Sequence, residues 1–178
     1  MNAVQIARFC EMYRGLVALD PARLDLEVWR WGDDVGGQVT DRLLEGDCGT
    51  EACAVGWACS MPGLIEQGLK YDLASSGPKY GQLGHWDAVQ AFFGLTEAEA
   101  NALFQAAYGL YDREGNRLVY ETDAQWMAQA VVDGYSVQVG FLETFARIRI
   151  DNVETTDHGR VLARMRAFAA WKGFDLNA

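Results

Sequence analysis

Apolar residues recur every three or four positions along much of this chain, a spacing typical of helices with one buried face. In a few shorter stretches they alternate with polar residues, as is typical of half-buried strands. The helical spacing covers residues 1–18, 86–93, 97–104 and 156–169. The alternation covers residues 24–28 and 69–73, which are expected to pair with each other. The chain is therefore predicted to be α+β and predominantly helical, with short antiparallel strands.

Helix caps and turn-forming residues separate these stretches. Thr96 and Glu99 have the spacing of a capping box, in which each side chain bonds the backbone N–H of the other. The last helix is expected to be capped by Thr155 or Thr156. Residues 74–84 are rich in glycine, serine and proline, which predicts a loop.

The stretch from Cys48 to Cys59 is predicted to form the centre of the fold. It holds three of the four cysteines, and Thr50 is a suitable N-cap for a helix that ends before Pro62. Small residues lie on nearly every side of this helix. We therefore expect a helical core built around a buried central helix.

Cys53 admits two interpretations. In the first turn of a helix its thiol pKa would be lowered, and Cys53 or Cys48 would then act as the nucleophile of a hydrolase or transferase, with His85 as the base. Alternatively, Cys53 and Cys59 are small apolar residues that fill the core. We favour the second interpretation, because the chain has only two histidines and His158 is expected to be exposed.

The cysteine spacing also argues against a zinc site. Cys48-x4-Cys53-x5-Cys59 lacks the short cysteine pairs of zinc-binding motifs. A Cys48–Cys53 disulfide is sterically conceivable, but a reducing compartment would keep both thiols reduced. The sequence holds no phosphate loop and no dinucleotide fingerprint, and we expect no metal and no cofactor.

A set of short motifs links the central stretch to the helices that follow it. The motifs are Cys48-Gly49-Thr50, Cys53, Gly56-Trp57-Ala58, Ala91-Phe92-Phe93-Gly94-Leu95-Thr96, Glu99-Ala100 and Leu103-Phe104. In this order the chain resembles a group of bacterial and phage proteins with no established activity, over about residues 1–111 and 155–172. The resemblance implies a shared fold and no catalytic residues. The group has no histidine at the position of His85, which weakens the nucleophile interpretation.

The segment 112–154 departs from that pattern and is predicted to be an insertion. A Gly115-Asn116 turn between apolar arms predicts a hairpin, Asp123 can cap a helix, and alternation over 137–150 predicts a second pair of strands. The chain is then a single domain of residues 1–178, with its core at 1–111 and 155–178.

The composition is acidic. There are 25 acids against 15 bases, which give a formal net charge of −10 and a pI of about 4.6. Binding to nucleic acid through a basic patch, or to an anionic membrane, is therefore not expected. The first residues lack the basic start of a signal peptide, and we expect a cytoplasmic location. Three arginines are expected to form a solvated face of the last helix: Arg160, Arg164 and Arg166.

These features favour a small acidic protein that binds or inhibits a protein partner, and the resemblance suggests a phage or mobile-element origin. The negative charge would imitate a nucleic acid on a basic partner surface. The acids are scattered, with Asp33-Asp34 and Glu97/Glu99 as the tight clusters. The predicted binding residues are aromatic edges and one acidic pair: Trp29, Trp31, Asp33, Asp34, Tyr80 and Trp86. The alternative is the cysteine-dependent enzyme. Neither the partner nor the oligomeric state follows from the sequence.

Overall fold

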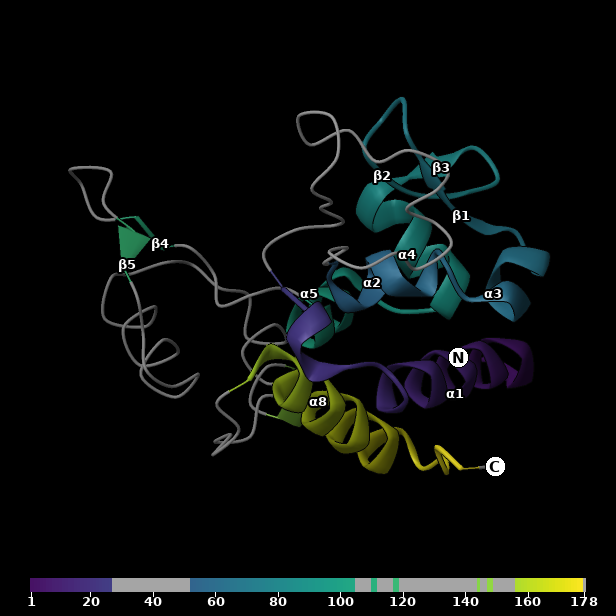
Figure 1. The fold of residues 1–178 in the computed structure, drawn as a ribbon. Helices are drawn as coiled ribbons and strands as arrows, with labels where there is room; N and C mark the ends of the chain where they lie inside the picture. Colours follow the sequence, from purple (N-terminus) through teal and green to yellow (C-terminus); the bar gives the residue numbers. More distant parts are fainter. Residues whose placement is uncertain are drawn as a thin grey trace.

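The computed structural model describes residues 1–26, 52–104, 110–111, 117–118, 144, 147–148 and 156–177. Within these ranges the protein has an α+β fold that is mostly helical, as predicted (Figure 1). Two long helices, α1 (Ala3–Val17) and α8 (Asp157–Lys172), lie side by side, and shorter helices and a small sheet pack on them.

Both long helices begin at capping side chains. Asn2 and Gln5 form a capping box at α1, and the Thr156 hydroxyl accepts a hydrogen bond from the Gly159 backbone N–H at α8. Thr156, one of the two predicted caps, is thus the residue used. Helix α8 ends at Gly173, whose φ of 75° is accessible to glycine without strain.

The central helix, α2 (Ala54–Ala58), is shorter than predicted and begins later. Its N-cap is Cys53, so the expectation of a helix starting after Thr50 is wrong; Thr50 itself lies outside the described residues. The chain is still extended at Ala52, which forms a parallel bridge with Leu24. All five residues of α2 are buried, which confirms the expectation of a buried central helix.

The chain then turns twice before it enters the sheet. Helix α3 (Pro62–Glu66) has proline in its first turn, where the missing N–H costs no hydrogen bond. Gly68 follows it with a φ of 97°.

Earlier in the chain, Asp20 caps the 3-10 turn η1 (Pro21–Arg23) by accepting from the Ala22 backbone N–H.

The sheet differs from the expected one. Strand β1 (Leu69–Asp72) pairs antiparallel with β2 (Gly77–Tyr80), which pairs with β3 (Leu83–Gly84). Within the described residues, 24–26 do not pair with β1, and Leu24 instead bridges Ala52; the expected loop at 74–84 contains two of the three strands.

Pro78 makes β2 hard to recognise in the sequence. The register of the sheet explains why a proline is tolerated in this strand. Tyr80 and Leu83 flank a two-residue loop that begins at Gly81, whose φ is 60°. In such a loop the backbone N–H of Tyr80 points toward the strand of Leu83. By alternation, the nitrogen of Pro78 points to the same side, beyond the end of β3 at Gly84. Its missing N–H therefore removes no ladder hydrogen bond.

Helices α4 (His85–Phe93) and α5 (Glu97–Phe104) follow, separated by Gly94 at a φ of 68°. The predicted capping box at α5 is confirmed. The Thr96 backbone N–H donates to Glu99 Oε2 at 2.8 Å, and the Glu99 N–H donates to the Thr96 hydroxyl at 3.3 Å. Glu99 Oε1 also lies 2.6 Å from Lys172 Nζ, which ties α5 to the end of α8.

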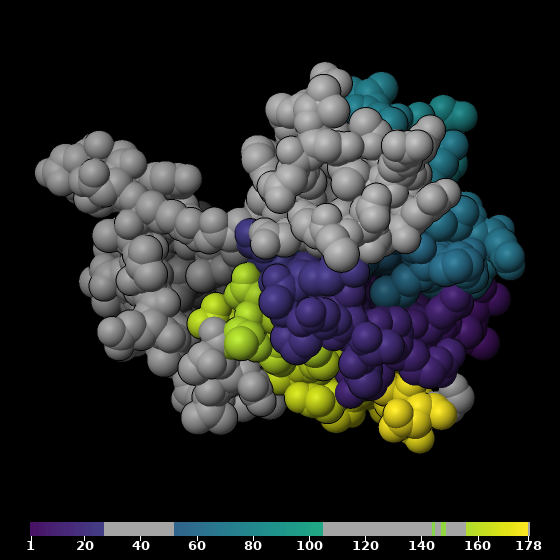
Figure 2. Space-filling model, viewed as in Figure 1, coloured from purple at the N-terminus to yellow at the C-terminus, as the bar shows by residue number. Residues whose placement is uncertain are grey.

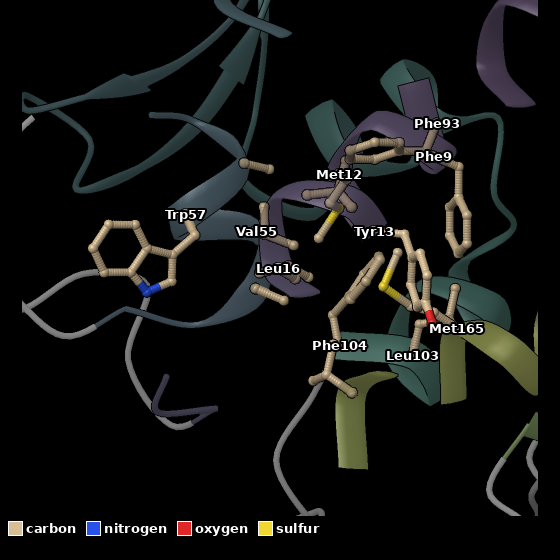
Figure 3. Close-up of a cluster of buried hydrophobic side chains, with 14 of the residues drawn as sticks. Phe9, Met12, Tyr13, Leu16, Val55, Trp57, Phe93, Leu103, Phe104 and Met165 are labelled. Atoms are coloured by element: carbon tan, nitrogen blue, oxygen red, sulfur yellow. The ribbon is translucent and has the colours of Figure 1, made fainter. Parts of the chain in front are cut away.

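Side chains from all these helices meet in one core (Figure 3). The ring centroid of Phe9 in α1 lies 5.2 Å from that of Phe168, 5.7 Å from that of Phe174 and 6.3 Å from that of Phe93. The aromatic rings thus join α1, α4, α8 and the chain after α8.

Few residues of the predicted insertion are described. Strands β4 (Leu110–Tyr111) and β5 (Arg117–Leu118) pair antiparallel, as expected for a hairpin, but Tyr111 pairs with Arg117, whereas a two-residue Gly115-Asn116 turn would pair Glu114 with Arg117. Residues 147–148 are helical, so the strand expected there is wrong, and Ile148 is 1% exposed within the core. The helix expected from Asp123 lies outside the described residues.

Candidate functional site

The predicted site residues divide into two sets. Trp29, Trp31, Asp33, Asp34 and Cys48 lie outside the described residues. Within the described residues lie Cys53, His85, Tyr80 and Trp86.

Cys53 occupies the N-cap of α2 and is only 3% exposed. Its sulfur accepts a hydrogen bond from the Gly56 backbone N–H at 3.4 Å. Burial raises the pKa of the thiol to about 11, and the nearby Asp25 carboxylate adds to the increase. The expectation that a helix N-terminus lowers this pKa is therefore wrong, because desolvation outweighs the backbone amides. At neutral pH the Cys53 side chain is a buried thiol.

His85 is exposed, in contrast to Cys53. It opens α4 with a φ of 53°, a conformation that is uncommon outside glycine. A Cβ atom at Gly77 would lie 2.6 Å from the His85 Nδ1, so the imidazole packs over the bare backbone of β2. His85 is thus placed against the sheet, while the sulfur of Cys53 is enclosed in the core.

Tyr80 is half-buried in a cluster with Arg8 and Phe92, and its ring meets that of Phe92 edge to face. Its ring centroid lies 5.1 Å from that of Phe92, and the Arg8 guanidinium carbon lies 4.1 Å from the Phe92 centroid and 5.4 Å from that of Tyr80. Arg8 also donates to the Phe92 carbonyl and to Gln67 Oε1, each at 2.9 Å. Trp86 packs against the core as well. Tyr80 and Trp86, the two predicted binding aromatics that the structure describes, therefore both have a packing role.

Two expectations for the last helix are wrong. His158 is only 9% exposed, and its Nε2 lies 2.8 Å from the Leu16 carbonyl, so this nitrogen carries the proton and donates. Arg164 is 1% exposed and belongs to the core side of α8. Arg166 is exposed and Arg160 is half-exposed, so the predicted basic face keeps two of its three members.

The acidic charge is less evenly spread than its scatter along the sequence suggests. Residues 27–51 hold seven acids and two bases, and residues 112–154 hold eight acids and four bases. The remaining residues hold ten acids and nine bases. The surplus of acids thus lies almost entirely in two segments, which a count by segment would have revealed from the sequence.

Neither a metal centre nor a membrane span is found in the part of the chain that the structure describes. No group of three or more His, Cys, Asp or Glu side chains among those residues could hold a metal ion. No helix among them is long and apolar enough to cross a membrane.

Comparisons with family models, with curated proteins and with solved structures find no match to this chain. Its function therefore has to be argued from its own residues.

Proposed function

We propose that this protein is a non-enzymatic interaction protein that binds a basic surface of a protein partner. The charge distribution carries the proposal: a nearly neutral helical core holds two segments with most of the surplus negative charge, 27–51 and 112–154. Opposite charge on a partner would speed encounter and favour the correct partner over neutral ones.

The core supports this proposal by holding the ends of the first acidic segment together. Leu24 and Ala52 form a bridge, so the chain leaves the core and returns to it at neighbouring positions. The segment between them holds the predicted binding residues Trp29, Trp31, Asp33 and Asp34. Aromatic side chains are common anchors in protein interfaces, and acids beside them would select a basic partner.

The chemistry of Cys53 also supports binding over catalysis. A nucleophilic cysteine needs an accessible thiol with a lowered pKa. Cys53 is buried and its pKa is about 11. We therefore assign it to the scaffold.

The partner that fits this charge is a protein with a basic groove, such as one that binds nucleic acid. An acidic protein that occupies such a groove would act as an inhibitor, in agreement with the suggested phage or mobile-element origin. The same proposal places the protein in the cytoplasm, where such partners occur and where thiols stay reduced.

Neutralising acids in segment 27–51 tests the proposal. A tagged protein should capture a stoichiometric partner from a host lysate, and the complex should weaken as salt is added. The double substitution Asp33→Asn and Asp34→Asn should weaken the purified complex roughly tenfold, since each exposed ion pair contributes up to about 1 kcal/mol.

Two exposed acids of the described core provide the matched control. Glu66→Gln with Glu97→Gln removes the same charge from α3 and α5, and should leave the affinity within about twofold. Equal losses for both pairs would show that total charge matters and not the segment. A protein that captures no partner across many lysates would contradict the proposal itself.

A further inference from the structure

The first turn of α8 is bonded to the end of α1 and to the chain just before the first acidic segment. The Leu26 backbone N–H donates to Asp157 Oδ2 at 3.0 Å, and His158 Nε2 donates to the Leu16 carbonyl at 2.8 Å. In Figure 2 the surface of residues 1–26 adjoins that of the start of α8. The two bonds hold both ends of residues 16–26 against one helical turn.

A second set of bonds joins residues 16–26 to the residues that follow the acidic segment. Asp25 N donates to the Ala52 carbonyl, and Ala52 N donates to the Arg23 carbonyl, each at 3.2 Å. Trp57 Nε1 also donates to the Arg23 carbonyl, at 2.9 Å, and the Arg23 guanidinium carbon lies 4.6 Å from the centroid of the Trp57 ring. Residues 23–26 are therefore held between α8 and the start of α2.

Asp157 is the side chain through which a displacement of Leu26 would reach α8. Leu26 is 6% exposed, and a buried backbone N–H that loses its acceptor costs about 1–3 kcal/mol. Asp157 is the first residue of α8, and its other oxygen, Oδ1, accepts from Arg160 at 3.1 Å in the same turn. Moving the chain at Leu26 must therefore break this bond or move the first turn of α8.

We propose that Asp157 is a positioning residue that couples the entry of segment 27–51 to the start of α8. The proposal rests on the proposed function, because binding of a partner to that segment is the event that the coupling would transmit. By linkage, whatever stabilises the first turn of α8 then also favours the bound state.

Two substitutions of Asp157 separate the hydrogen bond from the charge. Asp157→Asn and Asp157→Ala both remove one negative charge, but asparagine keeps an oxygen that can accept from Leu26. Hydrogen exchange should therefore be about fivefold faster in Asp157→Ala than in Asp157→Asn. The increase should appear at Leu26 and also at Gly159 and Arg160, whose amides bond Thr156 in the first turn of α8. Faster exchange at Leu26 alone, or equal rates in the two variants, would overturn the coupling.

A lysine-rich peptide is the probe for the bound state. In the wild type and in Asp157→Asn, adding the peptide should slow exchange at Gly159 and Arg160, and in Asp157→Ala it should not. Protection of both amides in all three proteins would overturn the coupling while leaving the proposed function intact. A peptide that fails to bind the wild type would count against the proposed function. The exchange rates without peptide would still decide whether Asp157 couples Leu26 to the first turn of α8.

Discussion

Replacing Phe9 with alanine should lower the free energy of unfolding by about 3–5 kcal/mol, the range for truncating a buried phenylalanine. Phe9 is 0% exposed and contacts rings from α4, from α8 and from the chain after α8. Its removal leaves a cavity where these elements meet, and the facing rings cannot all close it. Urea unfolding followed by tryptophan fluorescence measures the change.

Val4 on the same helix provides the control for Phe9. It is 55% exposed, so Val4→Ala should change the unfolding free energy by less than about 0.5 kcal/mol. If Phe9→Ala unfolded at the same urea concentration as Val4→Ala, the packing of α1 against α4 and α8 would be wrong.

Replacing Arg164 with alanine should cost about 3–5 kcal/mol, as much as the loss of Phe9. Arg164 is 1% exposed, and arginine side chains carry a positive charge in proteins. The guanidinium makes interactions inside the protein, and burying a cation without them would be costly. The substitution removes these interactions and also leaves a cavity inside the protein.

Arg166 tests whether burial is the reason. It lies two residues further along α8 and is exposed, so Arg166→Ala should shift the urea midpoint only slightly. Comparable midpoints for the two arginine variants would show that Arg164 lies on the solvent face, as the sequence had suggested.

The features of the fold that depend on neighbouring residues could be predicted from the sequence. The Thr96 capping box, the Thr156 cap and an antiparallel strand pair at 110–118 all form as expected. Each depends on groups within a few residues of one another, so local spacing specifies it.

The strand pairing could not be predicted in the same way. Alternation in residues 69–73 shows which side chains share a face, but it does not show which strand lies alongside. Pro78 made β2 resemble a loop, and only the position of β3 explains why the proline is tolerated there. The late start of α2 has a similar cause, because Ala52 is held extended by its bridge to Leu24.

The burial of particular polar side chains could not be predicted from the sequence. His158 and Arg164 were expected on the surface because residues of their type are usually exposed. Each is buried in the structure, and His158 bonds a carbonyl of α1 that is far away in the sequence. For Cys53 a nucleophile and a core residue are both compatible with the sequence, and the burial of its sulfur favours the core residue.

Alkylation of Cys53 in the native protein tests most directly the claim that α2 is scaffold. Iodoacetamide at neutral pH, followed by peptide mass spectrometry in a Cys48→Ser variant, gives the rate for each remaining cysteine. With a pKa of about 11 and 3% exposure, Cys53 should react at least roughly a hundredfold more slowly than glutathione, and the difference should disappear in urea. A native Cys53 that reacts faster than glutathione would contradict the assignment of α2 to the scaffold and would favour a cysteine-dependent enzyme.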